Sequence, residues 1–105
     1  MKIVINSCFG GFDLSEKALA MLNCESGFEY EIHDSLRTDE KLVKVVEELG
    51  EEASGDDSEL VVVTVPDEAT DWEIIRWDGM EKVHYVLGGK IYRISIIKPF
   101  KLTKI

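Results

Sequence analysis

Apolar and polar positions along the first third of the chain predict a strand followed by a helix. Residues 2–7 hold three successive β-branched residues, which is typical of a buried strand. Ser15 is a suitable N-cap, so we expect a helix over residues 16–23. Leu14 and Leu19 have the spacing of a hydrophobic staple across the start of this helix.

The next two segments differ in the spacing of their apolar residues. Residues 29–33 (EYEIH) alternate and predict a short strand. A second helix is expected to begin at Thr38 or Asp39 and to stop at Gly50, with acidic residues in its first turn, where they suit the helix dipole. Its apolar positions recur at i, i+3, i+4 and i+7 and form one stripe, made of Leu42, Val45, Val46 and Leu49.

The second half of the chain reads as strands and turns. Residues 60–65 (LVVVTV) are continuously apolar, so we expect a central strand that ends at Pro66. Residues 72–77 (WEIIRW) predict a further strand, and Asp78 and Gly79 begin a turn.

The last two predicted strands cover residues 82–87 and 90–98. Gly88 and Gly89 lie between them, and two glycines between strand-like runs indicate a hairpin. Taken together, these elements predict an α+β fold in one domain, residues 1–105. We expect a mostly antiparallel β-sheet with two α-helices packed on one face.

Composition and charge exclude several classes of protein. The net charge of −9 argues against a general binder of nucleic acid polymers, because phosphate contacts need Lys and Arg. No apolar run reaches the length of a membrane span, and residues 1–9 have no basic region that leads into a long apolar one, so we expect no signal peptide. Cys8 and Cys24 do not form a disulfide framework, so we expect free thiols in a reducing cytosol.

The charge is unevenly distributed. Residues 82–105 contain six basic residues and no acidic one, whereas residues 1–81 hold all 21 acidic residues. A basic end on an acidic body suits either subunit pairing or a small anion site, but it is also typical of an unevenly charged solvated surface. We expect a homo-oligomer, a dimer or tetramer, that uses the apolar residues of this end: Ile91, Ile94, Ile96, Ile97 and Phe100.

The segment NSCFGGFDLS, residues 6–15, joins the first strand to the first helix. It lacks the Arg that a cysteine phosphatase needs six residues after Cys8, and it matches neither the P-loop nor the dinucleotide fingerprint. The glycines let backbone amides approach a ligand or simply turn the chain. Phe9 and Phe12 have two interpretations, as rings that stack on a nucleotide base or as side chains that fill the core. The N-terminus of a helix that starts at Ser15 would favour an anion.

The remaining candidates are weaker. His33 and His84 have no metal-site spacing, and no motif predicts a cofactor; pairing of Cys8 with a histidine stays open because such partners meet only in the fold. Trp72 and Trp77 lie five residues apart, so one faces the core and the other is free for a ligand or an interface.

Two further features complete the set of candidates. Arg37 and Arg76 are candidate phosphate ligands, although an Arg beside an aromatic residue is also a common surface arrangement. The acidic run EELGEEASGDDSE is read either as a solvated face or as a decoy surface that mimics nucleic acid.

Three blocks, KIVINSCFGGFDLSEKAL, RTDEKLVKVVEELGEEASG and LVVVTVPDEATDWEI with WDGMEKV, resemble a widespread family of small tailed-phage and prophage proteins. The resemblance covers about residues 2–83. Phe9 and Trp77 stand where the family pattern has tyrosine, which puts any contact through those hydroxyls in doubt. The basic end from Gly88 onward lies outside the pattern.

This family looks similar to the anti-CBASS and anti-Thoeris-like sponge proteins. The resemblance implies a phage-encoded immune-evasion protein of the host bacterial cytoplasm, which binds a cyclic nucleotide signal without cleaving it. It therefore implies a binding protein rather than an enzyme. The residues themselves predict no cofactor, no metal and no membrane partner. The residues expected to form the ligand site are Cys8, Phe9, Gly10, Gly11, Phe12, Ser15, Arg37, Arg76 and Trp77.

Two other functions stay open at this point. One is an acidic inhibitor that binds a host protein through the Glu/Asp run. The other is a small enzyme that uses Cys8 as its nucleophile.

Overall fold

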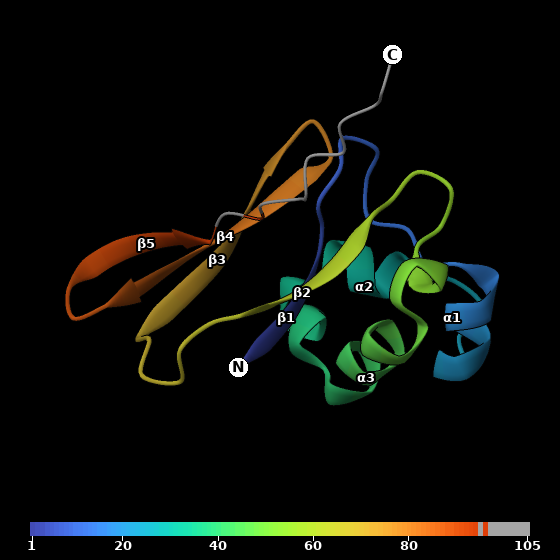
Figure 1. Ribbon diagram of the computed structural model, residues 1–105, viewed down its shortest axis with the longest axis horizontal. Helices are drawn as coiled ribbons and strands as arrows, with labels where there is room; N and C mark the ends of the chain where they lie inside the picture. Colours follow the sequence, from blue (N-terminus) through green and yellow to red (C-terminus); the bar gives the residue numbers. More distant parts are fainter. Residues whose placement is uncertain (95, 97–105) are drawn as a thin grey trace, which may run out of the picture.

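The computed structural model describes residues 1–94 and 96, and it confirms the α+β fold. Two antiparallel sheets are present in this part of the chain (Figure 1). The first pairs β1 (Lys2–Asn6) with β2 (Leu60–Thr64), and the second has the order β3 (Asp71–Trp77), β4 (Met80–Leu87), β5 (Lys90–Ile94). The helices are α1 (Glu16–Leu22), α2 (Phe28–Ile32) and α3 (Glu40–Leu49), with 3-10 helices η1 (Asp34–Thr38) and η2 (Gly50–Ala53).

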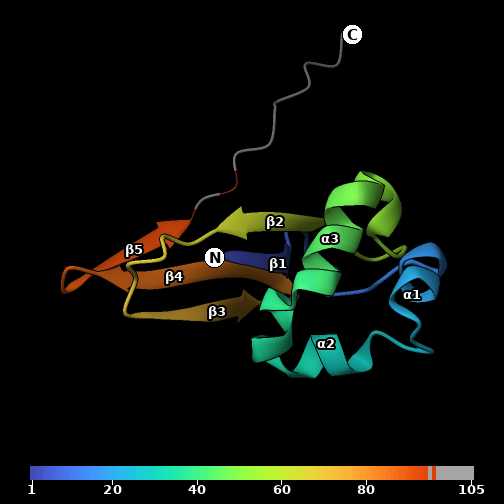
Figure 2. The same cartoon turned by 90° about the horizontal axis from the view of Figure 1, so that it is seen from below.

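The β1–β2 sheet forms the middle of three layers. Figure 1 shows it between the helices on one side and β3–β5 on the other, and Figure 2 shows the helices gathered at one end of the molecule. One face, with Val4 and Leu60, joins a helix-side cluster that includes Leu42 and Val46. The other face belongs to a sheet-side cluster made of Ile3, Ile5, Val63, Val65, Ile74 and Val83.

This layering explains the apolar runs in both strands of the first sheet. A strand buried on both faces needs apolar residues at successive positions instead of alternate ones. Leu60, Val63 and Val65 are buried as the apolar run predicts, Val61 and Val62 are half-buried, and Thr64 is exposed. The expectation of a central strand, however, is wrong. β2 pairs only with β1 in the described chain, because the second sheet lies over its face and not beside its edge.

The two long predicted helices are confirmed at both ends. The Ser15 Oγ accepts a hydrogen bond from the Ala18 N–H at 3.1 Å, as an N-cap does. Asp39 caps α3, and Gly50 ends it with a φ of 57°, a conformation that favours glycine. The predicted apolar stripe of α3 faces the helix-side cluster.

The predicted strand over residues 29–33 is wrong, because this segment forms the one-turn helix α2. A five-residue alternation carries too little period to separate the two structures. The turn is stabilised from outside the segment: the Arg37 guanidinium donates hydrogen bonds to the carbonyls of Tyr30 and Glu31. These are carbonyls at the helix C-terminus, which have no partner within the helix itself.

Both predicted hairpin turns are present with two residues each. Trp77 pairs with Met80 across Asp78 and Gly79, and Leu87 pairs with Lys90 across Gly88 and Gly89. All four turn residues have positive φ, which matches the right-handed twist of the flanking strands. The predicted last strand, residues 90–98, is described only as far as Ile94 and at residue 96. Its remainder, with Ile97 and Phe100, lies outside the described residues.

Candidate functional site

The loop after β1 is fastened by the buried side chain of Asn6. Its Nδ2 donates to the carbonyls of Cys8 at 2.8 Å and Gly79 at 2.9 Å, and its Oδ1 accepts the Glu59 N–H at 2.8 Å. A single amide thus joins the loop, the start of β2 and the β3–β4 turn. Segments more than 50 residues apart in sequence meet at this point.

Close backbone contact accounts for two of the glycines at this junction. A Cβ on Gly10 would lie 1.7 Å from the Asp57 carbonyl oxygen, so no side chain fits there. A Cβ on Gly79 would lie 2.8 Å from the Phe9 carbonyl oxygen. Gly10 is therefore required for packing, whereas Gly11, with a φ of 141°, has open space around its Cβ position.

The junction brings two exposed aromatic rings together on the surface. Phe9 is 54% exposed and Trp77 is 75% exposed, and their ring centroids lie 6.0 Å apart in an edge-to-face arrangement. A single exposed ring is ordinary on a protein surface, but two exposed rings in contact form an apolar patch of the kind that binding sites use. Trp72 packs against the sheet-side cluster instead, so the two tryptophans face opposite sides as predicted.

Residues of β4 line a cavity of about 290 Å³. Met80, the cross-strand neighbour of Trp77, belongs to its wall. Lys82 is exposed and lies two residues further along β4, hence on the same side of the strand as Met80. The described residues that line the cavity are Ser7, Met80, Glu81, Lys82, Ile94 and Ile96.

Lys82 was not among the residues that the sequence indicated. The signal was present, since the Asp78–Gly79 turn fixes the pairing of Trp77 with Met80, and strand alternation then places Lys82 on that side. Lys82 supplies a cation that can donate to an anionic ligand. The Ser7 hydroxyl donates to the Glu59 carbonyl at 2.9 Å, which leaves its oxygen free to accept.

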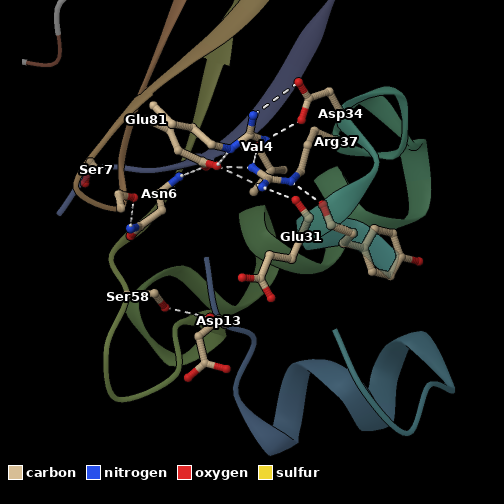
Figure 3. A network of polar contacts seen from close by, with 12 residues as sticks. Val4, Asn6, Ser7, Asp13, Glu31, Asp34, Arg37, Ser58 and Glu81 are labelled. Carbon is tan, nitrogen blue, oxygen red and sulfur yellow. Dashed lines mark hydrogen bonds and ion pairs between the residues drawn. The ribbon is translucent and has the colours of Figure 1, made fainter. Parts of the chain in front are cut away.

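Arg37, by contrast, lies in the interior. It is fully buried, and Figure 3 shows it beside Glu81, to which it donates two hydrogen bonds at 2.6 and 2.9 Å. Its guanidinium carbon also lies 3.8 Å from the centroid of the Phe12 ring, a cation–π contact. Arg37 and Phe12 therefore stabilise the core, and neither reaches an external ligand.

The second arginine extends the same ion cluster toward the surface. Arg76 donates to Glu81 at 3.0 Å and to both carboxylate oxygens of Asp34. The hydrogen bond to Asp34 is the main cause that raises the pKa of the Arg76 guanidinium. Because Arg76 and Trp77 are adjacent on a strand, their side chains point to opposite faces, so Arg76 does not join the aromatic pair.

The other predicted ligand residues are engaged in the fold. Ser15 caps α1 and donates its hydroxyl to the Glu52 carbonyl at 2.6 Å. The Cys8 thiol contacts the Asp57 carbonyl at 3.3 Å and the Asn6 side-chain oxygen at 3.4 Å. Neither partner is a general base. The structure describes no contact of Cys8 with His33 or His84.

The structure thus brings together only part of the predicted site: Phe9, Gly10, Gly11 and Trp77. Among the described residues, no three His, Cys, Asp or Glu side chains group as a metal site would require, and no helix is long and apolar enough to cross a membrane. Comparisons with protein-family models, with curated proteins and with solved structures gave no match.

Proposed function

We propose that this protein captures a small nucleotide ligand through Phe9 and Trp77 and holds it without chemical change. The observation that carries the proposal is the exposed contact of these two rings, which come from segments far apart in the sequence. Nucleotide bases stack on such rings, and one stacked base contributes about 1–3 kcal/mol.

The neighbouring cavity supports the same class of ligand. Its volume of about 290 Å³ lies close to the lower end for small-molecule sites, near ~300 Å³. Lys82 at its wall is suited to a phosphate, whose negative charge an ammonium group binds as a point charge. Met80 and Ile94 add apolar surface for a sugar or a base.

The resemblance to phage proteins adds a biological setting. A phage protein that sequesters a cyclic nucleotide signal in the cytoplasm of its host blocks the defence that depends on the signal. Such a protein needs tight binding and no turnover. The surroundings of Cys8 fit this role, because the contacts given for its thiol are with a carbonyl and an amide oxygen and not with a base.

Isothermal titration calorimetry with a panel of cyclic dinucleotides and cyclic ADP-ribose isomers tests the proposal. We expect Trp77→Ala and Phe9→Ala each to weaken binding about tenfold or more, since ~1.4 kcal/mol is a factor of ten. Lys82→Met should weaken a phosphate-bearing ligand by a similar factor.

A matched control is available on α2. Phe28 is 57% exposed, close to the exposure of Phe9, but it belongs to a different surface. Phe28→Ala should leave affinity unchanged. An absence of heat with the unmodified protein across the panel, or an equal loss in Phe28→Ala, would contradict the proposal.

A protein partner is the second candidate, and one observation favours it. The Asp57 backbone packs against Gly10, and Asp78 follows Trp77, so both segments that carry the aromatic pair adjoin an acidic residue. Acidic residues near exposed rings also suit a basic protein surface. In that case Glu51→Ala and Asp57→Ala should weaken capture of the partner, whereas nucleotide binding should scarcely respond to either change.

A further inference from the structure

The β3–β4–β5 sheet has two faces, and only one of them contributes to a core cluster of the described chain, whereas the other contacts Phe9 through Trp77 at one end. The strand register assigns the inner face, because Ile74 pairs with Val83, which pairs with Ile94. All three belong to or pack on the sheet-side cluster, as do Trp72 and Tyr85. Residues at the alternate positions therefore form the outer face.

The outer face combines apolar positions with one row that holds charges of both signs, while Asp71 and Lys82 each add a single charge to a neighbouring row. Glu73 on β3 pairs with His84 on β4, which in turn pairs with Arg93 on β5. Val86 and Ile91 pair in the next row, and Ile91 is 72% exposed. The apolar side chains on this face belong to neither core cluster: Ile75, Trp77, Met80, Val86 and Ile91.

We propose that this outer face binds a second copy of the chain, with a two-fold axis that runs along β4. A rotation of 180° about that axis stacks the two sheets face to face and keeps each row at its own height. It places β3 of one copy over β5 of the other. Glu73 then lies opposite the partner's Arg93, and Arg93 lies opposite the partner's Glu73, so the face is complementary to itself.

Glu73 and Arg93 are too far apart to pair within one molecule, but a second copy brings each of them opposite its counterpart. Glu73 and Arg93 flank β4 in one molecule, so their backbones lie roughly 10 Å apart, two strand spacings. The structure describes no ion pair between them or with any other residue. The same axis brings Lys82 of β4 opposite the partner's Lys82, a like-charge contact that weakens the association, and in each copy this side chain also lines the cavity.

The size of the face sets the strength to expect. Three strands of up to eight residues present roughly 14 Å by 27 Å, about 400 Å². A standard stable interface covers about 800 Å² on each partner. The dimer should therefore dissociate on dilution. Trp77 lies four residues from Glu73, about 14 Å along the strand, so the aromatic pair stays at the rim.

Sedimentation velocity over a concentration series, without nucleotide, tests the surface independently of the proposed ligand. Glu73→Arg places two cations opposite each other at both ends of the row, and Arg93→Glu places two anions there. We expect each variant to weaken self-association about tenfold or more. Glu68→Arg makes the same charge change at an exposed position outside the sheet and should have no effect.

Mixing the two variants provides the decisive measurement. In a mixed dimer each arginine meets a glutamate again, so an equimolar mixture of Glu73→Arg and Arg93→Glu should recover association that neither shows alone. A folding defect would not be rescued in this way. The proposal is overturned if the unmodified protein stays monomeric through the series, if mixing restores nothing, or if Glu68→Arg weakens association equally.

Discussion

The buried pair of Arg37 and Glu81 allows a stability prediction to be worked out from its contacts. Glu81→Gln keeps the size of the side chain and removes its charge. Arg37 then loses the carboxylate that accepts two of its hydrogen bonds, while it stays fully buried. The amide that replaces the carboxylate also presents an N–H₂ group toward donors, including the Asn6 N–H at 2.8 Å.

The expected loss is large for a domain of this size. Removing one partner of a buried ion pair costs about 3–5 kcal/mol, because the other charge stays buried without compensation. For a domain of roughly 100 residues, 1 kcal/mol corresponds to about 4–8 °C in Tm. We therefore expect Glu81→Gln to lower Tm by about 12 °C or more.

Asp34→Asn is the matched control. Asp34 accepts from Arg76 in the same ion cluster, but its side chain is 41% exposed. Exposed ion pairs contribute about 0–1 kcal/mol, so its Tm should change by only a few degrees. Thermal unfolding followed by circular dichroism, with urea unfolding as a second measurement, compares the two variants.

A double-mutant cycle adds a second comparison. Arg37→Met combined with Glu81→Gln removes both charges, so the double variant should lose less stability than the two single changes added together. If Glu81→Gln behaves like Asp34→Asn, or if the cycle shows no coupling, the interpretation of a buried, mutually dependent pair is refuted.

Two further predictions concern Gly10, in the loop after β1, and Tyr30, in the one-turn helix α2. Gly10→Ala should cost about 1–3 kcal/mol or more, since its Cβ would overlap the Asp57 carbonyl; an unchanged urea midpoint would show that the loop is not packed there. Burial raises the pKa of the Tyr30 phenol, and Cys24 and Asp39 raise it further. Stability linked to a raised folded-state pKa is complete below the unfolded value and is lost as pH rises through the folded value. Above about pH 10 the unmodified protein should therefore lose Tm more steeply than Tyr30→Phe, and parallel curves would contradict this.

The sequence by itself determined the elements whose signals are local. The period of the apolar residues in α3, the cap at Ser15 and the glycines of the Gly88–Gly89 turn each depend on a few neighbouring residues. These features are set by backbone geometry and short-range hydrogen bonds, so they can be read without the rest of the fold. The α+β class followed from the order of such elements.

Contacts between distant segments needed the tertiary structure. The sequence could not show that Arg37 points inward, because its partner Glu81 is 44 residues away, and an arginine without a visible partner is expected at the surface. For the same reason residues 29–33 were expected to form a strand, since the arginine that satisfies the end of α2 comes from outside it.

For the aromatic pair and the β1–β2 sheet, too, the sequence indicated the residues and the tertiary structure decided their neighbours. Phe9 and Trp77 were each candidates, but their segments meet through tertiary contacts, which include the Asn6 hydrogen bonds to the loop and to Gly79. An apolar run over residues 60–65 indicates burial on both faces, yet burial does not specify what covers each face. The tertiary structure decided that point, because stacking one sheet on another depends on side chains from every layer at once.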